Sequence, residues 1–193
     1  MKRLLIAAVL GLGLCSPAVA QEFRIKPVAE KRLKELPPGA LFWRVENFPT
    51  LAQAQAAAGP TALPVEVHGK VWLFTLGAKD TSTPGGSKVA EIGPVPALGA
   101  AEYLLRINYT GGPAGVKTPI HTHPGSEAFY VLGGRLGQTT AHGTMYAETG
   151  KTMNGHGADT PMVVFNPGPE ELNALVMFVV DATRPFSSPA RMP

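Results

Sequence analysis

Two histidines and a glutamate, His121, His123 and Glu127, lie close together in the middle of the chain. On a β-strand, residues two apart point to the same face, so both imidazoles would face one way. Three residues separate His123 from Glu127, and Pro124-Gly125 can turn the chain so that the next strand brings the carboxylate back to the rings. Two imidazoles and one carboxylate suit a divalent metal with open coordination positions. The spacing therefore predicts a metal site built on these three residues.

The first twenty residues have the pattern of a secretory signal peptide. Lys2 and Arg3 precede a short apolar run, and Ala18-Val19-Ala20 is a small-x-small cleavage site. The apolar run is shorter than the ~20 residues of a membrane-spanning helix. We therefore expect residues 1–20 to be removed and the protein to be exported, either to the periplasm or out of the cell, with no membrane contact afterwards.

Cleavage would also change the chemistry that is open to the chain. It removes the single cysteine, Cys15, and lowers the formal charge from +3 to +1. A lipid anchor at Cys15 is disfavoured because Leu14 stands where lipoprotein signals have a small residue. Disulfides and thiolate ligands are excluded from the mature chain, so nitrogen and oxygen must hold any metal. This near-neutral net charge lacks the excess of lysine and arginine that is typical of nucleic-acid-binding proteins.

The rest of the chain divides into two regions of different composition. Residues 21–64 are mixed, with helix formers over 28–35, a strand at 41–45 and a helix over 51–56 capped by Thr50. From residue 65 to about 185, short apolar runs alternate with turns rich in Gly and Pro. We expect an N-terminal extension packed on an all-β sandwich or barrel, followed by an extended C-terminal tail over 186–193.

One strand carries candidate pocket residues. Residues 103–109 alternate, with aromatic and aliphatic side chains on one face and Arg106 and Asn108 on the other. Arg106 and Asn108 would line the interior of a barrel or else face solvent. Phe129, in the apolar strand after the histidines, is a further candidate for the pocket wall, although packing explains it equally well.

The histidine segment resembles the first cupin motif. That motif is Gly, five residues, His-x-His, three residues, Glu, six residues and Gly, and the sequence meets it from Gly115 through His121, His123 and Glu127 to Gly134. The resemblance implies a cupin jelly-roll β-barrel whose motif side chains point inward. It also implies a bound divalent metal, for which iron or manganese is favoured over zinc, nickel or copper.

The second cupin motif, which should supply a fourth histidine, is degenerate. Gly150 is in place, but Pro161 stands where the histidine belongs, and His156 comes about five residues early. Three explanations are open. In the first, the site uses three protein ligands only. In the second, His156 or Asp159 is the fourth ligand. In the third, the site has lost its metal and kept the barrel as a binding cup.

Fold alone does not give function, so two classes are carried forward. The first is an enzyme acting on a small oxygen-bearing molecule. A resemblance to quercetinase-type dioxygenases implies that Glu127 is the catalytic residue, as a metal ligand or, if displaced, as a nearby base. The same resemblance points to oxidative cleavage of a phenolic or dicarbonyl compound. The second is a non-catalytic cupin that binds a sugar or a small acid; a germin-like wall or storage protein would share the fold and the export. Many cupins pair through edge strands, so the resemblance also allows a homodimer.

Overall fold

The computed structural model describes residues 22–192, so the predicted signal peptide lies outside the described part of the chain. Within that range the chain is built almost entirely of strands. No helix there is long and apolar enough to cross a membrane. The elements are β1 (Arg24–Leu33), β2 (Phe42–Phe48), α1 (Leu51–Ala57), β3 (Ala62–Val67), β4 (Lys70–Gly77), β5 (Ser87–Ile92), β6 (Tyr103–Gly112), β7 (His121–Thr122), β8 (Gly125–Gly133), β9 (Arg135–Thr140), β10 (Gly143–Glu148), β11 (Thr152–Asn154), β12 (Met162–Phe165), β13 (Leu172–Asp181) and β14 (Ser188–Pro189).

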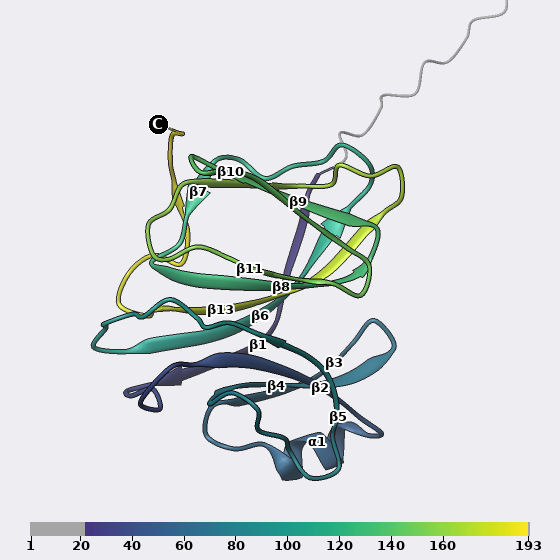
Figure 1. Ribbon diagram of the computed structural model, residues 1–193, viewed down its shortest axis with the longest axis vertical. Helices are drawn as coiled ribbons and strands as arrows, with labels where there is room; N and C mark the ends of the chain where they lie inside the picture. Colours follow the sequence, from purple (N-terminus) through teal and green to yellow (C-terminus); the bar gives the residue numbers. More distant parts are fainter. Residues whose placement is uncertain (1–21, 193) are drawn as a thin grey trace, which may run out of the picture.

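These strands form three layers (Figure 1). The middle layer is a five-stranded sheet in the order β1-β6-β13-β8-β11, and a second five-stranded sheet, β10-β9-β12-β7-β14, lies over one of its faces. The strand pairs are antiparallel. The all-β prediction is confirmed, with the jelly roll formed by two facing sheets that are hydrogen-bonded separately.

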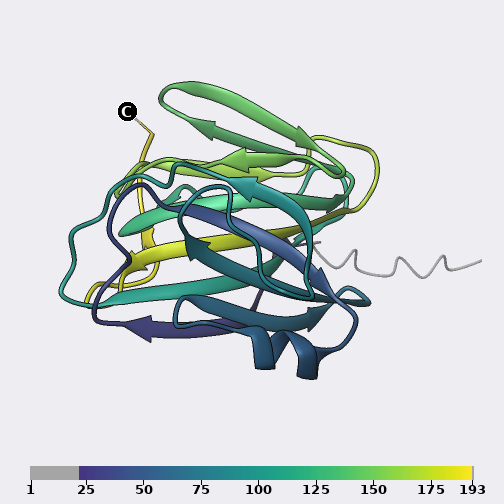
Figure 2. The same ribbon diagram turned by 60° about the horizontal axis from the view of Figure 1, so that its bottom comes forward.

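The third layer covers the other face of the middle sheet. It is a four-stranded sheet in the order β3-β4-β2-β5, with α1 on its far side. Figure 2 shows α1 and the β9–β10 hairpin at opposite ends of the molecule. The predicted start of the barrel at residue 65 falls inside β3, and β3 to β5 belong with β2 rather than with the two sheets of the jelly roll. The pattern of short apolar runs and turns predicts strands, but it does not predict which sheet each strand joins.

The composition of residues 28–35 predicts a helix, and this prediction is wrong. The structure has β1 there, paired antiparallel with β6 at the edge of the middle sheet. Hydrogen bonding to an existing strand outweighs a helix propensity that is worth only a few tenths of a kcal/mol per residue. The helix predicted after Thr50 is confirmed as α1, and the Thr50 hydroxyl accepts a hydrogen bond from the backbone N–H of Gln53 at 3.2 Å.

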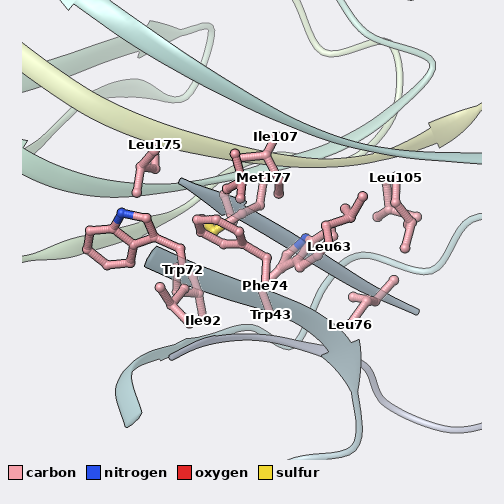
Figure 3. Packing of buried hydrophobic residues seen from close by; sticks show 14 residues of the cluster. Trp43, Leu63, Trp72, Phe74, Leu76, Ile92, Leu105, Ile107, Leu175 and Met177 are labelled. Carbon is pink, nitrogen blue, oxygen red and sulfur yellow. The ribbon is translucent and has the colours of Figure 1, made fainter. Parts of the chain in front are cut away.

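The main hydrophobic core lies between the third layer and the middle sheet (Figure 3). Trp43, Trp72 and Phe74 project from the third layer, and all three are almost completely buried. They pack in one cluster with Leu105 and Ile107 of β6. Because successive side chains of a strand point to opposite faces, burying these β6 residues turns the residues between them toward the jelly-roll interior.

Candidate metal and ligand site

His121 opens β7, a two-residue strand held between β12 and β14, and His123 follows directly after that strand. Their ring centroids are 4.9 Å apart and the rings meet edge to face. His121 Nδ1 lies 2.9 Å from the carbonyl oxygen of Pro119, and His123 Nδ1 lies 2.7 Å from that of Phe186. A carbonyl oxygen only accepts, so each Nδ1 carries the proton and donates it. In the neutral rings this leaves the lone pair on Nε2.

Glu127 faces the histidines from β8. Its side chain is buried, and Oε2 lies 3.9 Å from His123 Nε2. The other carboxyl oxygen, Oε1, accepts a hydrogen bond from Nε2 of Gln138 on β9, which is fully buried. Gln138 therefore holds the carboxyl group in place. Gln138 was not among the candidates predicted from the sequence, and only its inward position in an alternating strand could have indicated it.

Burial controls the protonation of this pair. It raises the pKa of Glu127 to about 8, because a buried carboxylate loses its hydration, although the Gln138 hydrogen bond opposes the shift. Burial also lowers the pKa of His123 to about 4, against the hydrogen bond to the Phe186 carbonyl and with help from the charges of His121 and Arg106. Burial therefore favours the neutral form of both groups.

The donor chemistry of these residues fits a divalent metal. A ligating histidine usually donates its other ring N–H to a carbonyl or carboxylate, as both rings do here. Two ligand atoms that each lie ~2.1 Å from one ion are at most about 4.2 Å apart, and the 3.9 Å between His123 Nε2 and Glu127 Oε2 is within that limit. Within residues 22–192, no three His, Cys, Asp or Glu side chains already form a complete metal cluster. His121, His123 and Glu127 are the residues that would hold the ion.

The three residues line a cavity of about 490 Å³ between the two sheets of the jelly roll. Its wall is mostly apolar and includes Phe129. Arg106 and Asn108 also line it, because the register of β6 turns them away from the main core. The full lining is Phe23, Ile25, Pro27, Arg106, Asn108, Thr110, Thr118, Pro119, Ile120, His121, His123, Glu127, Phe129, Val164, Val176, Phe178, Phe186, Ser187 and Pro189.

The C-terminal segment forms one wall of the cavity. The tail predicted over 186–193 contains β14, which pairs with β7 and brings Pro189 opposite His121. The Phe186 ring lies 4.8 Å from the His123 ring and 4.9 Å from the Phe178 ring. The segment therefore supports His123 through both its backbone and its aromatic ring. Phe186 was missed by the sequence analysis, since no motif marks it.

The two candidate fourth ligands lie away from the cavity lining. The ring of His156 is 6.0 Å from that of His142, in the turn between β9 and β10. The carboxylate of Asp159 forms an ion pair with Arg184, with 2.6 Å between Oδ1 and Nη2. The loop that carries them does contact the site through its backbone, where Asp159 N–H donates to the carbonyl oxygen of His123 at 2.8 Å.

No protein-family model matches the chain, and no curated protein does. Solved structures match in part. A cupin superfamily protein from Desulfitobacterium hafniense is 13% identical over 40% of this chain and 68% of its own, with a TM-score of 0.36. The DMSP lyase DddQ from Ruegeria pomeroyi is 22% identical over 45% of this chain and 43% of its own, with a TM-score of 0.39. A cupin-like protein from Thermotoga maritima is 14% identical over 46% of this chain and 65% of its own, with a TM-score of 0.40.

Two of these three proteins are described as a cupin or a cupin-like protein. The matched region is less than two-thirds of DddQ and of the Thermotoga protein. With TM-scores below 0.5 the likeness is partial. The cupin description therefore depends on the motif and on the two facing antiparallel sheets, and not on what any of these proteins does.

Proposed function

We propose that this chain is an exported, metal-binding cupin that acts on a small oxygen-bearing molecule held in the jelly-roll cavity. The observation that carries the proposal is the pair of imidazoles whose Nδ1 atoms are fixed by backbone carbonyls, with Glu127 opposite them. Two oriented nitrogen donors and a buried carboxyl group at the wall of a cavity are what a metal with open positions requires.

Each of these residues has a separate part in that function. His121 and His123 present Nε2 lone pairs, and Glu127 supplies Oε2 as a ligand or, when it is displaced, as a base beside the substrate. The apolar walls keep bulk water from the reacting atoms. A divalent metal bound there would supply Lewis-acid activation of a substrate oxygen and, if it is iron or manganese, redox chemistry with dioxygen.

Oxidative cleavage of a phenolic or dicarbonyl compound, with dioxygen as co-substrate, is the reaction class we propose. The test is oxygen uptake by the metal-loaded protein with a panel of phenols and diketones. Consumption that depends on both substrate and metal is expected. No uptake with any member of the panel would exclude this class.

The metal site itself is tested by elemental analysis. The protein should be purified from its native compartment without an affinity-tag metal column, beside a His121→Ala, His123→Ala double variant. Near-stoichiometric iron or manganese in the wild type and none in the variant is the expected result. Absence of metal from both would contradict the proposal.

A second candidate is a non-catalytic cupin that binds a small acid or a sugar. It is favoured by the mostly apolar cavity and by Pro161 at the position of the fourth histidine of the motif. Ligand binding that survives complete removal of the metal would favour this candidate, because a metalloenzyme would lose part of its substrate site with the ion. The homodimer remains a prediction that sedimentation or light scattering would test.

A further inference from the structure

The middle sheet places a positive charge opposite Glu127 across the floor of the cavity. In the register of the sheet, Arg106 of β6 pairs with Phe178 of β13, and Phe178 pairs with Glu127 of β8. Neighbouring strands lie ~4.8 Å apart, so the backbones of Arg106 and Glu127 are separated by about 10 Å. A small molecule lying over Phe178 would reach both.

Arg106 is held in place, yet part of its guanidinium is unused. Its Nε lies 2.5 Å from Oε1 of Glu30, and its Cζ lies 3.8 Å over the centre of the Phe186 ring. Among the described residues, neither Nη atom forms a hydrogen bond to protein. It is also the one lysine or arginine among the described residues that line the cavity. The free Nη edge can take a planar carboxylate in two parallel hydrogen bonds.

Asn108 adds a second unused polar group two residues further along β6. Its side chain is 3% exposed, it lines the cavity, and its Oδ1 has no hydrogen-bond partner within residues 22–192. An unsatisfied buried amide oxygen destabilises the fold. A ligand that donates a hydrogen bond there would recover that free energy. Because Asn108 and Arg106 face the same way, the donor must lie near the carboxylate of the ligand.

From these positions we propose that the cavity takes a small hydroxycarboxylic acid with an apolar body. The carboxylate lies at Arg106, the neighbouring hydroxyl donates to Asn108 Oδ1, and the hydrocarbon or aromatic body covers Phe178 toward His121 and Glu127. This inference rests on the proposed function only for what happens at the far end of the ligand. The contacts to Arg106 and Asn108 do not require a metal.

The test uses three probes of nearly equal size, with affinity measured by calorimetry. Mandelate carries the carboxylate, the hydroxyl and the aromatic body; phenylacetate lacks the hydroxyl, and mandelamide lacks the charge. Mandelate is expected to bind about 10- to 100-fold more tightly than mandelamide, as a charge-assisted pair predicts, and more tightly than phenylacetate. Equal affinity for the three probes would overturn the inference.

Variants assign each preference to its residue. Arg106→Gln is expected to abolish the preference for mandelate over mandelamide, and Asn108→Leu the preference over phenylacetate. Glu30→Gln removes a competing carboxylate from Arg106 and is expected to tighten mandelate binding, a gain that misfolding cannot produce. A Glu30→Gln protein that binds mandelate no more tightly than the wild type would contradict the assigned place of the carboxylate.

Metal content measured on the same samples separates this inference from the proposed function. Selective mandelate binding by protein that contains no metal would support the acid site and contradict the proposed metal site. Bound metal without selectivity among the three probes would support the metal site and contradict the proposed acid site.

Discussion

The imidazole Nδ1–H of His123 donates to the backbone carbonyl oxygen of Phe186 over 2.7 Å, and so joins the histidine motif to the C-terminal segment. The same segment pairs with β7 through β14 and places the Phe186 ring under the guanidinium of Arg106. A part of the chain that the sequence predicts to be an extended tail therefore orients one candidate metal ligand and the charged end of the cavity.

Removing this segment should weaken metal binding. A chain that ends at Pro185 loses both the carbonyl acceptor of His123 and one wall of the cavity. Loss of such an outer contact typically lowers metal affinity about 10- to 100-fold, and we expect a decrease of that size in competition with a chromophoric chelator.

The matched control ends at Ala190. It keeps Phe186, β14 and the hydrogen bond from Ala190 N–H to the carbonyl oxygen of Ile120, at 3.1 Å. Its metal affinity should equal that of the full chain. If the two shortened chains bind metal equally well, the Phe186 carbonyl has no role in orienting His123.

Gly155 allows the loop after β11 to lie directly against Glu127. A Cβ at this position would be 2.7 Å from Glu127 Cγ and closer still to its backbone oxygen, which cannot move aside without breaking β8. Gly155→Ala should therefore destabilise the fold by about 1–3 kcal/mol and shift the carboxyl group away from the histidines. Urea unfolding measures the first effect and metal titration the second.

A nearby glycine provides the comparison. At Gly157 a Cβ would lie 3.6 Å from the Cβ of Pro96, which is an ordinary contact. Gly157→Ala should leave stability and metal affinity nearly unchanged. Equal effects of the two substitutions would mean that the loop itself, rather than its contact with Glu127, is sensitive to added volume.

His156 should prove dispensable for the metal. Its ring lies beside that of His142, and burial together with the charge of His142 lowers its pKa. We expect His156→Ala to retain the metal content of the wild type, whereas His123→Ala loses it, both by elemental analysis. Loss of metal from His156→Ala would show that the loop moves His156 into the site when metal binds.

The sequence predicts the contacts of this site between residues that are near one another in the chain, but not the contacts between distant segments. The histidine spacing and the turn before Glu127 are local, so the motif predicts which side chains lie near one another. Gln138 lies on β9 and Phe186 lies just before β14. Both meet the motif only after long-range strand pairing, which no spacing encodes. The alternation of β6 predicts that Arg106 and Asn108 share a face, but the sequence does not say whether that face is buried.

The same difference explains the outcome for the fold. Thr50 caps α1 through a contact three residues away, which can be read directly from the sequence. β1 is a strand because β6 lies beside it in space, although its own composition favours a helix. The third layer was not predicted because it also depends on long-range pairing. β4 and β5 pair with β2, and this pairing places β3–β5 in a sheet separate from the jelly roll.

The third layer should unfold together with the jelly roll, because the main core lies between them (Figure 3). Phe74 is fully buried there, so Phe74→Ala should lower the free energy of unfolding by about 3–5 kcal/mol. Met145, exposed on β10, is the control, and Met145→Ala should change it by no more than about 0.5 kcal/mol. Urea denaturation measures both values.

Two optical probes can test whether the layers unfold as one unit. The only two tryptophans, Trp43 and Trp72, both lie in the third layer, so tryptophan fluorescence reports on that layer, while circular dichroism reports on all three sheets. Coincident transitions are expected. A fluorescence transition at lower urea than the dichroism change would mean that the third layer opens first. The face of β6 that turns Arg106 and Asn108 into the cavity would then be held by the jelly roll alone.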